Sequence, residues 1–107
     1  MTSPSEGRVV AFVDIGTNSV RLLIERLLPN ETFTVLSDQK EVVRLGEMEF
    51  VAGEIQDAAA ERLLRVCRHL VEVARHYEAE EIVAVATSAM REARNQAALV
   101  RRLRREA

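Results

Sequence analysis

Several features are scarce in this sequence of 107 residues, and each scarcity excludes a class of protein. A single cysteine, Cys67, excludes an internal disulfide and a cysteine-based metal site, and it suits a reducing compartment. The longest apolar runs, Val9 to Val13 and Ile82 to Ala86, are far shorter than the roughly 18 residues that a membrane span needs. The first residues lack the basic and apolar regions of a signal peptide. We therefore expect a cytoplasmic protein with no membrane partner.

The length and composition of the chain indicate one small domain. Hydrophobic residues make up 48% of the chain, which is enough for one core, and the length leaves no room for two domains. A net charge of −2 argues against nonspecific binding to nucleic acid. Residues 1–7 contain Pro, Ser, Thr and Gly without apolar periodicity, so we expect a disordered leader there and ordered structure over residues 8–107.

Apolar periodicity predicts an α/β protein. Short runs with many β-branched residues predict strands, and apolar residues at three- and four-residue spacing predict helices. The strands are expected at Arg8 to Asp14, Ser19 to Leu28, Thr32 to Val43 and Glu81 to Ala86, and the helices at Glu54 to about Glu78 and Ala89 to Glu106.

The order β-β-β-α-β-α predicts how the elements are connected. Short turns make the first three strands an antiparallel meander. The helix then allows the fourth strand to lie parallel to the first, by a right-handed crossover. The first strand is apolar on both faces, so we expect it to be central and covered on two sides, and the fourth strand is likewise expected to be buried.

The segment from Asp14 to Ser19 is the first candidate site. Gly16 allows the backbone to approach a ligand closely, and successive turn amides can bind an anion. Thr17, Asn18 and Ser19 add neutral donors, and Asp14 suits a hydrated Mg²⁺ that bridges to phosphate. The same residues are also good hairpin formers, so the pattern alone leaves both interpretations open.

The segment from Ala86 to Asn95 is the second candidate site. Thr87 and Ser88 stand between a strand and a helix, where unpaired helical N–H groups favour an anion. Arg91 is one turn further on and could bind the same anion with both arms of its guanidinium group. The alternative is that the hydroxyl groups only cap the helix.

Together the two segments resemble the exopolyphosphatase and guanosine pentaphosphate phosphohydrolase (Ppx/GppA) family, within the actin-like ATPase superfamily. The resemblance lies in Asp-Ile-Gly-Thr-Asn-Ser at residues 14–19 and Thr-Ser-Ala-x-Arg-x-Ala-x-Asn at residues 87–95. It implies a ribonuclease H-like half-domain with sheet order 3-2-1-4 that ends before a fifth strand, so that the second half and the second domain are absent.

The resemblance also implies Mg²⁺-dependent hydrolysis of a terminal phosphoanhydride in polyphosphate or guanosine pentaphosphate. Asp14 would orient the metal, possibly through water, and Arg91 would neutralise charge in the transition state. The other expected phosphate contacts come from Gly16, Thr17, Asn18, Ser19, Thr87 and Ser88.

The family's catalytic base and second phosphate loop have no counterpart in this chain. Glu92 is interpreted as a helix-dipole residue and Glu106 as a solvated chain end. We therefore expect weak phosphate binding and no turnover. The strand at 82–86 would be an exposed edge, so self-association through it or through the long helices is expected.

Alternative interpretations remain for the function and for a few residues. The alternative functions are a sugar or acetate kinase fragment and a noncatalytic alarmone sensor. His69 and His76 are expected at the surface and Cys67 in the core. The arginines at residues 101–105 are expected to oppose the helix dipole, with polyanion binding as the other interpretation.

Overall fold

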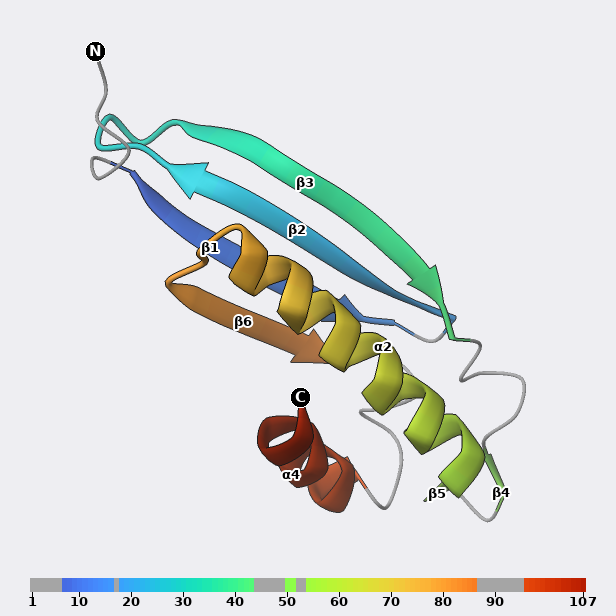
Figure 1. The fold of residues 1–107 in the computed structure, drawn as a ribbon. Helices are drawn as coiled ribbons and strands as arrows, with labels where there is room; N and C mark the ends of the chain where they lie inside the picture. Colours follow the sequence, from blue (N-terminus) through green and yellow to red (C-terminus); the bar gives the residue numbers. More distant parts are fainter. Residues whose placement is uncertain (1–6, 17, 44–49, 52–53, 87–95) are drawn as a thin grey trace.

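The computed structural model describes residues 7–16, 18–43, 50–51, 54–86 and 96–107. Its main feature is a sheet of four strands with one long helix across one face and a second, shorter helix that packs against the first (Figure 1). The strands are β1 (Arg8–Ile15), β2 (Ser19–Leu27), β3 (Phe33–Val42) and β6 (Glu81–Ala86), and the helices are α2 (Asp57–His76) and α4 (Gln96–Glu106).

The strand order is β3-β2-β1-β6, which confirms the predicted order 3-2-1-4. The β1–β2 and β2–β3 pairs are antiparallel, whereas β6 lies parallel to β1. The β2–β3 ladder changes register between Ile24 and Glu25, where β3 carries an extra residue. This bulge later decides which β3 side chains lie beside those of β2.

The core lies between the sheet and the helices. Alternate residues of β1 and β2 point toward α2, as expected from the period of two in a strand. Leu22, Leu63 and Leu70 are completely buried. The other buried members of this cluster are Val9, Ala11, Val13, Ile15, Val20, Ile24, Val43, Ala59, Ala60, Cys67, Ala74 and Leu99.

The prediction that β1 is covered on both faces is wrong for the described part of the chain. Both helices contribute to a single cluster with the inward residues of β1 and β2. On the opposite face of β1, Val10 is buried, but Phe12 is only half-buried and Asp14 is exposed. Apolar composition on two faces therefore did not require a helix on each.

The predicted start of the long helix at Glu54 is also wrong. Glu54–Ile55 forms strand β5, which pairs antiparallel with β4 (Phe50–Val51). Gln56 has extended backbone angles, φ −71° and ψ 154°, so α2 begins at Asp57. Ile55 fits the helical spacing as the first apolar residue of the predicted helix. Its conformation is nevertheless that of a strand, because it pairs with Phe50 across the β4–β5 hairpin.

Strand β6 is an exposed edge and not a buried strand. It has the predicted bounds, but 37% of Ile82 and 51% of Val85 remain exposed. Its position at the end of the strand order leaves its outer side without a partner strand in the described sheet. The expectation of an exposed edge is thus confirmed, and the expectation of burial is corrected.

The described part of helix α4 is Gln96–Glu106, and residues 89–95, which were also expected to be helical, lie outside the described part of the chain. The sequence predicts an inner apolar stripe of Ala93, Ala97, Val100 and Leu103 on this helix. The structure instead buries Leu99, which is 3% exposed and does not belong to that stripe. Val100 and Leu103 are half-buried as expected, but Ala97 is exposed. The buried stripe is therefore rotated from the predicted one.

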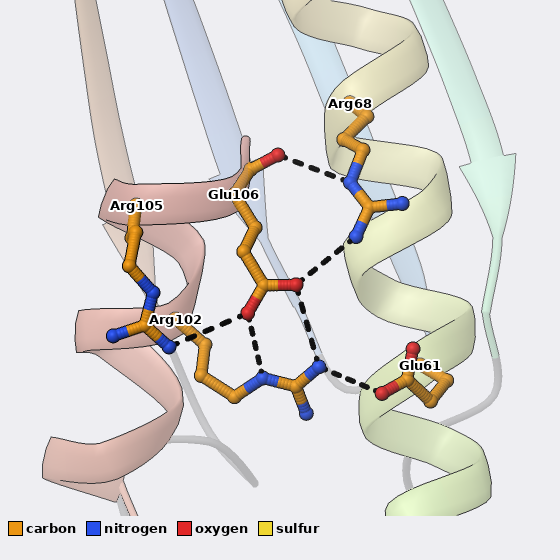
Figure 2. A network of polar contacts seen from close by, with 5 residues as sticks. All are labelled: Glu61, Arg68, Arg102, Arg105 and Glu106. Carbon is orange, nitrogen blue, oxygen red and sulfur yellow. Dashed lines mark hydrogen bonds and ion pairs between the residues drawn. The ribbon is translucent and has the colours of Figure 1, made fainter.

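A polar network fastens α4 to α2 (Figure 2). Arg102 donates to Glu106 at 3.0 Å and to Glu61 at 2.7 Å, and Arg68 donates to the Glu106 carboxylate at 3.2 Å. Hydrogen bonds from Arg102 are the main cause of a lowered pKa at Glu106. The interpretation of Glu106 as a solvated chain end is therefore wrong, because its carboxylate links the two helices.

Candidate functional site

The turn between β1 and β2 positions the first predicted motif. The Gly16 N–H donates to the carbonyl oxygen of Ser19 at 2.9 Å, which closes the turn. A Cβ atom at Gly16 would lie 3.2 Å from that same oxygen, so a side chain there would crowd the backbone. Glycine therefore keeps this turn tight and its outer surface open to a ligand.

A hollow of about 540 Å³ lies next to this turn. Three adjacent strands form it, because Asp14 of β1 pairs with Arg21 of β2, which pairs with Lys40 of β3. These side chains alternate with those that point to the helices, so the hollow lies on the sheet face opposite the core. Its lining residues are Asp14, Gly16, Ser19, Arg21, Asp38 and Lys40.

Arg21 and Asp38 form a bidentate pair within the hollow. Arg21 donates from Nε to Oδ1 at 2.9 Å and from Nη2 to Oδ2 at 2.6 Å. The hydrogen bonds raise the pKa of Arg21 and lower the pKa of Asp38. About half of each side chain is exposed, so the pair adds little to stability and mainly fixes the direction of the guanidinium group.

The structure brings together three of the predicted site residues. Asp14, Gly16 and Ser19 line the hollow. Asn18 is exposed in the turn and does not line it, although its carbonyl oxygen accepts a hydrogen bond from the Val43 N–H at 2.8 Å. The remaining predicted site residues, Thr17, Thr87, Ser88 and Arg91, lie outside the described part of the chain, as does Glu92.

The strands that carry the two motifs nevertheless end side by side. Ile15 at the end of β1 pairs with Ala86 at the end of β6, and the two strands run in the same direction. The carboxyl ends of parallel strands are where open α/β sheets bind ligands. This register is compatible with a single site formed by both motifs.

Three residues of the hollow were missed by sequence reasoning: Arg21, Asp38 and Lys40. Arg21 follows Asp-Ile-Gly-Thr-Asn-Ser in the segment that resembles the family's first phosphate loop, but it was not predicted to contact phosphate. A usable signal was its position two residues after Ser19, since both then lie on the same face of β2. For the β3 residues, the signal depends on the exact register with β2.

Other titratable residues have structural roles. Cys67 is 4% exposed, and burial raises its pKa to about 11, so the thiol stays protonated and inert at neutral pH. His69 and His76 are exposed on α2, as expected. Within the described residues, no group of three or more His, Cys, Asp or Glu side chains could hold a metal ion. Likewise, no described helix is long and apolar enough to cross a membrane.

Comparison with known proteins identifies the family. A model of the Ppx/GppA phosphatase family matches residues 23–107. The chain belongs to this family. Among curated members, Exopolyphosphatase 1 of Mycobacterium leprae is 32% identical over 97 residues, and Exopolyphosphatase 1 of Mycobacterium tuberculosis is 31% identical over 97 residues.

Solved structures of the Ppx/GppA family share the fold. The Aquifex aeolicus family member has a TM-score of 0.84 at 28% identity, covering 94% of this chain and 32% of its own. An exopolyphosphatase from Cytophaga hutchinsonii has a TM-score of 0.85 at 26% identity, covering 92% of this chain and 31% of its own. The alignments to the two mycobacterial enzymes cover 91% of this chain, but only 29% and 28% of those proteins. The chain thus spans less than a third of the length of each of these relatives.

Proposed function

We propose that this chain is the N-terminal phosphate-binding part of a phosphoanhydride hydrolase. The whole protein would release terminal phosphate from inorganic polyphosphate or guanosine pentaphosphate. The observation that carries the proposal is the hollow beside the Gly16 turn, where Arg21 and Lys40 stand next to a glycine backbone and the Ser19 side chain. Family membership and relatives named exopolyphosphatase support it.

Each residue type in the hollow suits a different part of a phosphate chain. The Ser19 hydroxyl can donate a hydrogen bond to one phosphate group, and so can turn amides other than that of Gly16, which donates to the Ser19 carbonyl oxygen. Lys40 offers a point charge, and Arg21 offers planar donors already directed by Asp38. In the proposed site, Thr17 and Asn18 complete the cradle, Thr87 and Ser88 flank it, and Arg91 neutralises charge that develops during transfer.

The donors at the hollow suit a hydrated Mg²⁺ shared with the substrate. Mg²⁺ usually keeps several waters and is held by one or two carboxylates together with substrate phosphates. Asp14 is exposed at the hollow, whereas both oxygens of Asp38 accept hydrogen bonds from Arg21. We assign the metal contact to Asp14, directly or through water. When bound, the ion would neutralise phosphate charge and help to orient the substrate.

The two carboxylates that line the hollow, Asp14 and Asp38, already have other assignments in this proposal. Asp38 is paired with Arg21, and Asp14 would serve the metal. Glu106 does not line the hollow and binds Arg68 and Arg102 between the two helices. This leaves the hollow without a candidate general base among the described residues. The 107-residue chain is therefore expected to bind phosphate chains weakly and to hydrolyse none.

Calorimetric titration with tripolyphosphate and Mg²⁺ tests this proposal, combined with an assay for released phosphate. We expect a Kd on the order of 1 mM, or about −4 kcal/mol, and no phosphate release above the buffer blank. Sulfate at equal ionic strength is the control for general anion binding. Absence of tripolyphosphate binding would contradict the phosphate-binding role, and measurable release would contradict the predicted inactivity.

The proposal includes a cytoplasmic location, because a chain with the single cysteine Cys67 suits a reducing compartment. It also includes self-association at the β6 edge. The edge offers exposed Ile82 and Val85 to a second copy. We expect light scattering to show dimers at high protein concentration. A Val85→Lys variant should shift the chain toward monomer, because a charged edge discourages pairing. A monomeric parent chain at high concentration would contradict this prediction.

A further inference from the structure

Arg62 lies near the start of α2 and its guanidinium group contacts the chain just after β3. Its Nε and Nη2 atoms donate to the carbonyl oxygen of Val43 at 3.0 Å and 2.6 Å. Arg62 is half-buried, and Val43 is 1% exposed. Hydrogen bonds from a charged donor are stronger than those between neutral groups, and partial burial shields this contact from water.

Val43, the residue that follows β3, also contacts the candidate phosphate-binding turn. The Val43 N–H donates to the Asn18 carbonyl oxygen at 2.8 Å. Asn18 stands inside the turn that the Gly16 N–H closes on Ser19. Val43 is therefore contacted on its carbonyl by helix α2 and on its amide by the turn, so its position couples the two.

We propose that Arg62 is a positioning residue for the phosphate-binding turn at residues 16–19. Arg62 fixes the backbone of Val43, and Val43 in turn fixes Asn18. A backbone cradle binds an anion well only when its donors are held within about 0.5 Å of the productive geometry. This inference rests on the proposed phosphate-binding function, but the coupling between Arg62 and the turn can be measured without a ligand.

The test uses an Arg62→Met variant, which keeps the aliphatic stem but removes the donors. The expected result is faster hydrogen exchange at the Val43 amide, shifted NMR signals for Gly16 and Ser19, and a tripolyphosphate Kd that rises about tenfold. Arg62→Lys should restore most of the affinity, since an ammonium group can still donate to the carbonyl. Arg65→Met is the matched control, because Arg65 is an exposed arginine on the same helix, and it should leave all three readouts unchanged.

The outcomes separate this inference from the function on which it rests. Unchanged turn signals and affinity in a folded Arg62→Met chain would overturn the positioning role. An equal loss of affinity in Arg65→Met would also overturn it, because the effect would then follow net charge. If the parent chain binds no tripolyphosphate but Arg62→Met still shifts the turn signals, the phosphate-binding function fails and the positioning of the turn stands.

Discussion

Replacing Leu63 with alanine is expected to lower the free energy of unfolding by about 2–5 kcal/mol. Leu63 is completely buried in the cluster between α2 and the sheet, so truncation removes apolar contacts and leaves a cavity. A domain of this size is typically stable by only about 5–15 kcal/mol, so the loss is a large fraction of the total. Urea denaturation followed by circular dichroism measures the change.

Val35→Ala is the control for this core substitution. Val35 lies on the edge strand β3 and is 50% exposed, so its truncation should change the unfolding free energy by less than about 0.5 kcal/mol. Similar effects at the two positions would show that the cluster around Leu63 is not the main core.

Arg21→Ala and Asp38→Asn are expected to change tripolyphosphate affinity in opposite directions. Arg21→Ala removes a cationic donor and leaves the Asp38 carboxylate in the hollow, so affinity should fall about tenfold or more. Asp38→Asn removes a negative charge that repels the anionic ligand, so affinity should rise. Calorimetric titration at neutral pH measures both.

The choice of neutral pH follows from the pKa of Asp38. The hydrogen bonds from Arg21 lower this pKa, so the carboxylate is charged throughout the neutral range and its ion pair is lost only as the pH falls through the lowered pKa. Asp38→Asn therefore compares a charged group with a neutral one of similar shape. A fall in affinity in both variants would show that the paired geometry matters more than the charge of Asp38.

Most of the sheet was predictable from the sequence, because residue alternation reports burial directly. Val20, Leu22 and Ile24 lie at alternate positions of β2, and all three are completely buried. The conformation of Ile55 was not predictable in the same way, since its spacing also fits the helix that follows. The exposure of β6 depends on its place at the sheet edge, which its apolar composition does not encode.

The candidate site was predictable only on the β1–β2 side. Asp14, Gly16 and Ser19 belong to one short turn, so their proximity follows from chain connectivity. The β3 contribution depends on the bulge between Ile24 and Glu25. Counting pairs back from Leu27 and Phe33 without that bulge would place Gln39 opposite Arg21, whereas the actual register places Lys40 there.

Selective labelling of Lys40 tests the central claim most directly, because it reports where a phosphate chain binds. Lys40 is the only lysine in the sequence, and the N-terminal amine serves as an internal control. An amine-reactive reagent is added with and without tripolyphosphate, and mass spectrometry follows both sites. At a ligand concentration about five times Kd, labelling of Lys40 should slow about sixfold while labelling of the N-terminal amine does not change. Equal labelling of Lys40 with and without bound ligand would contradict the assignment of the hollow as the phosphate site.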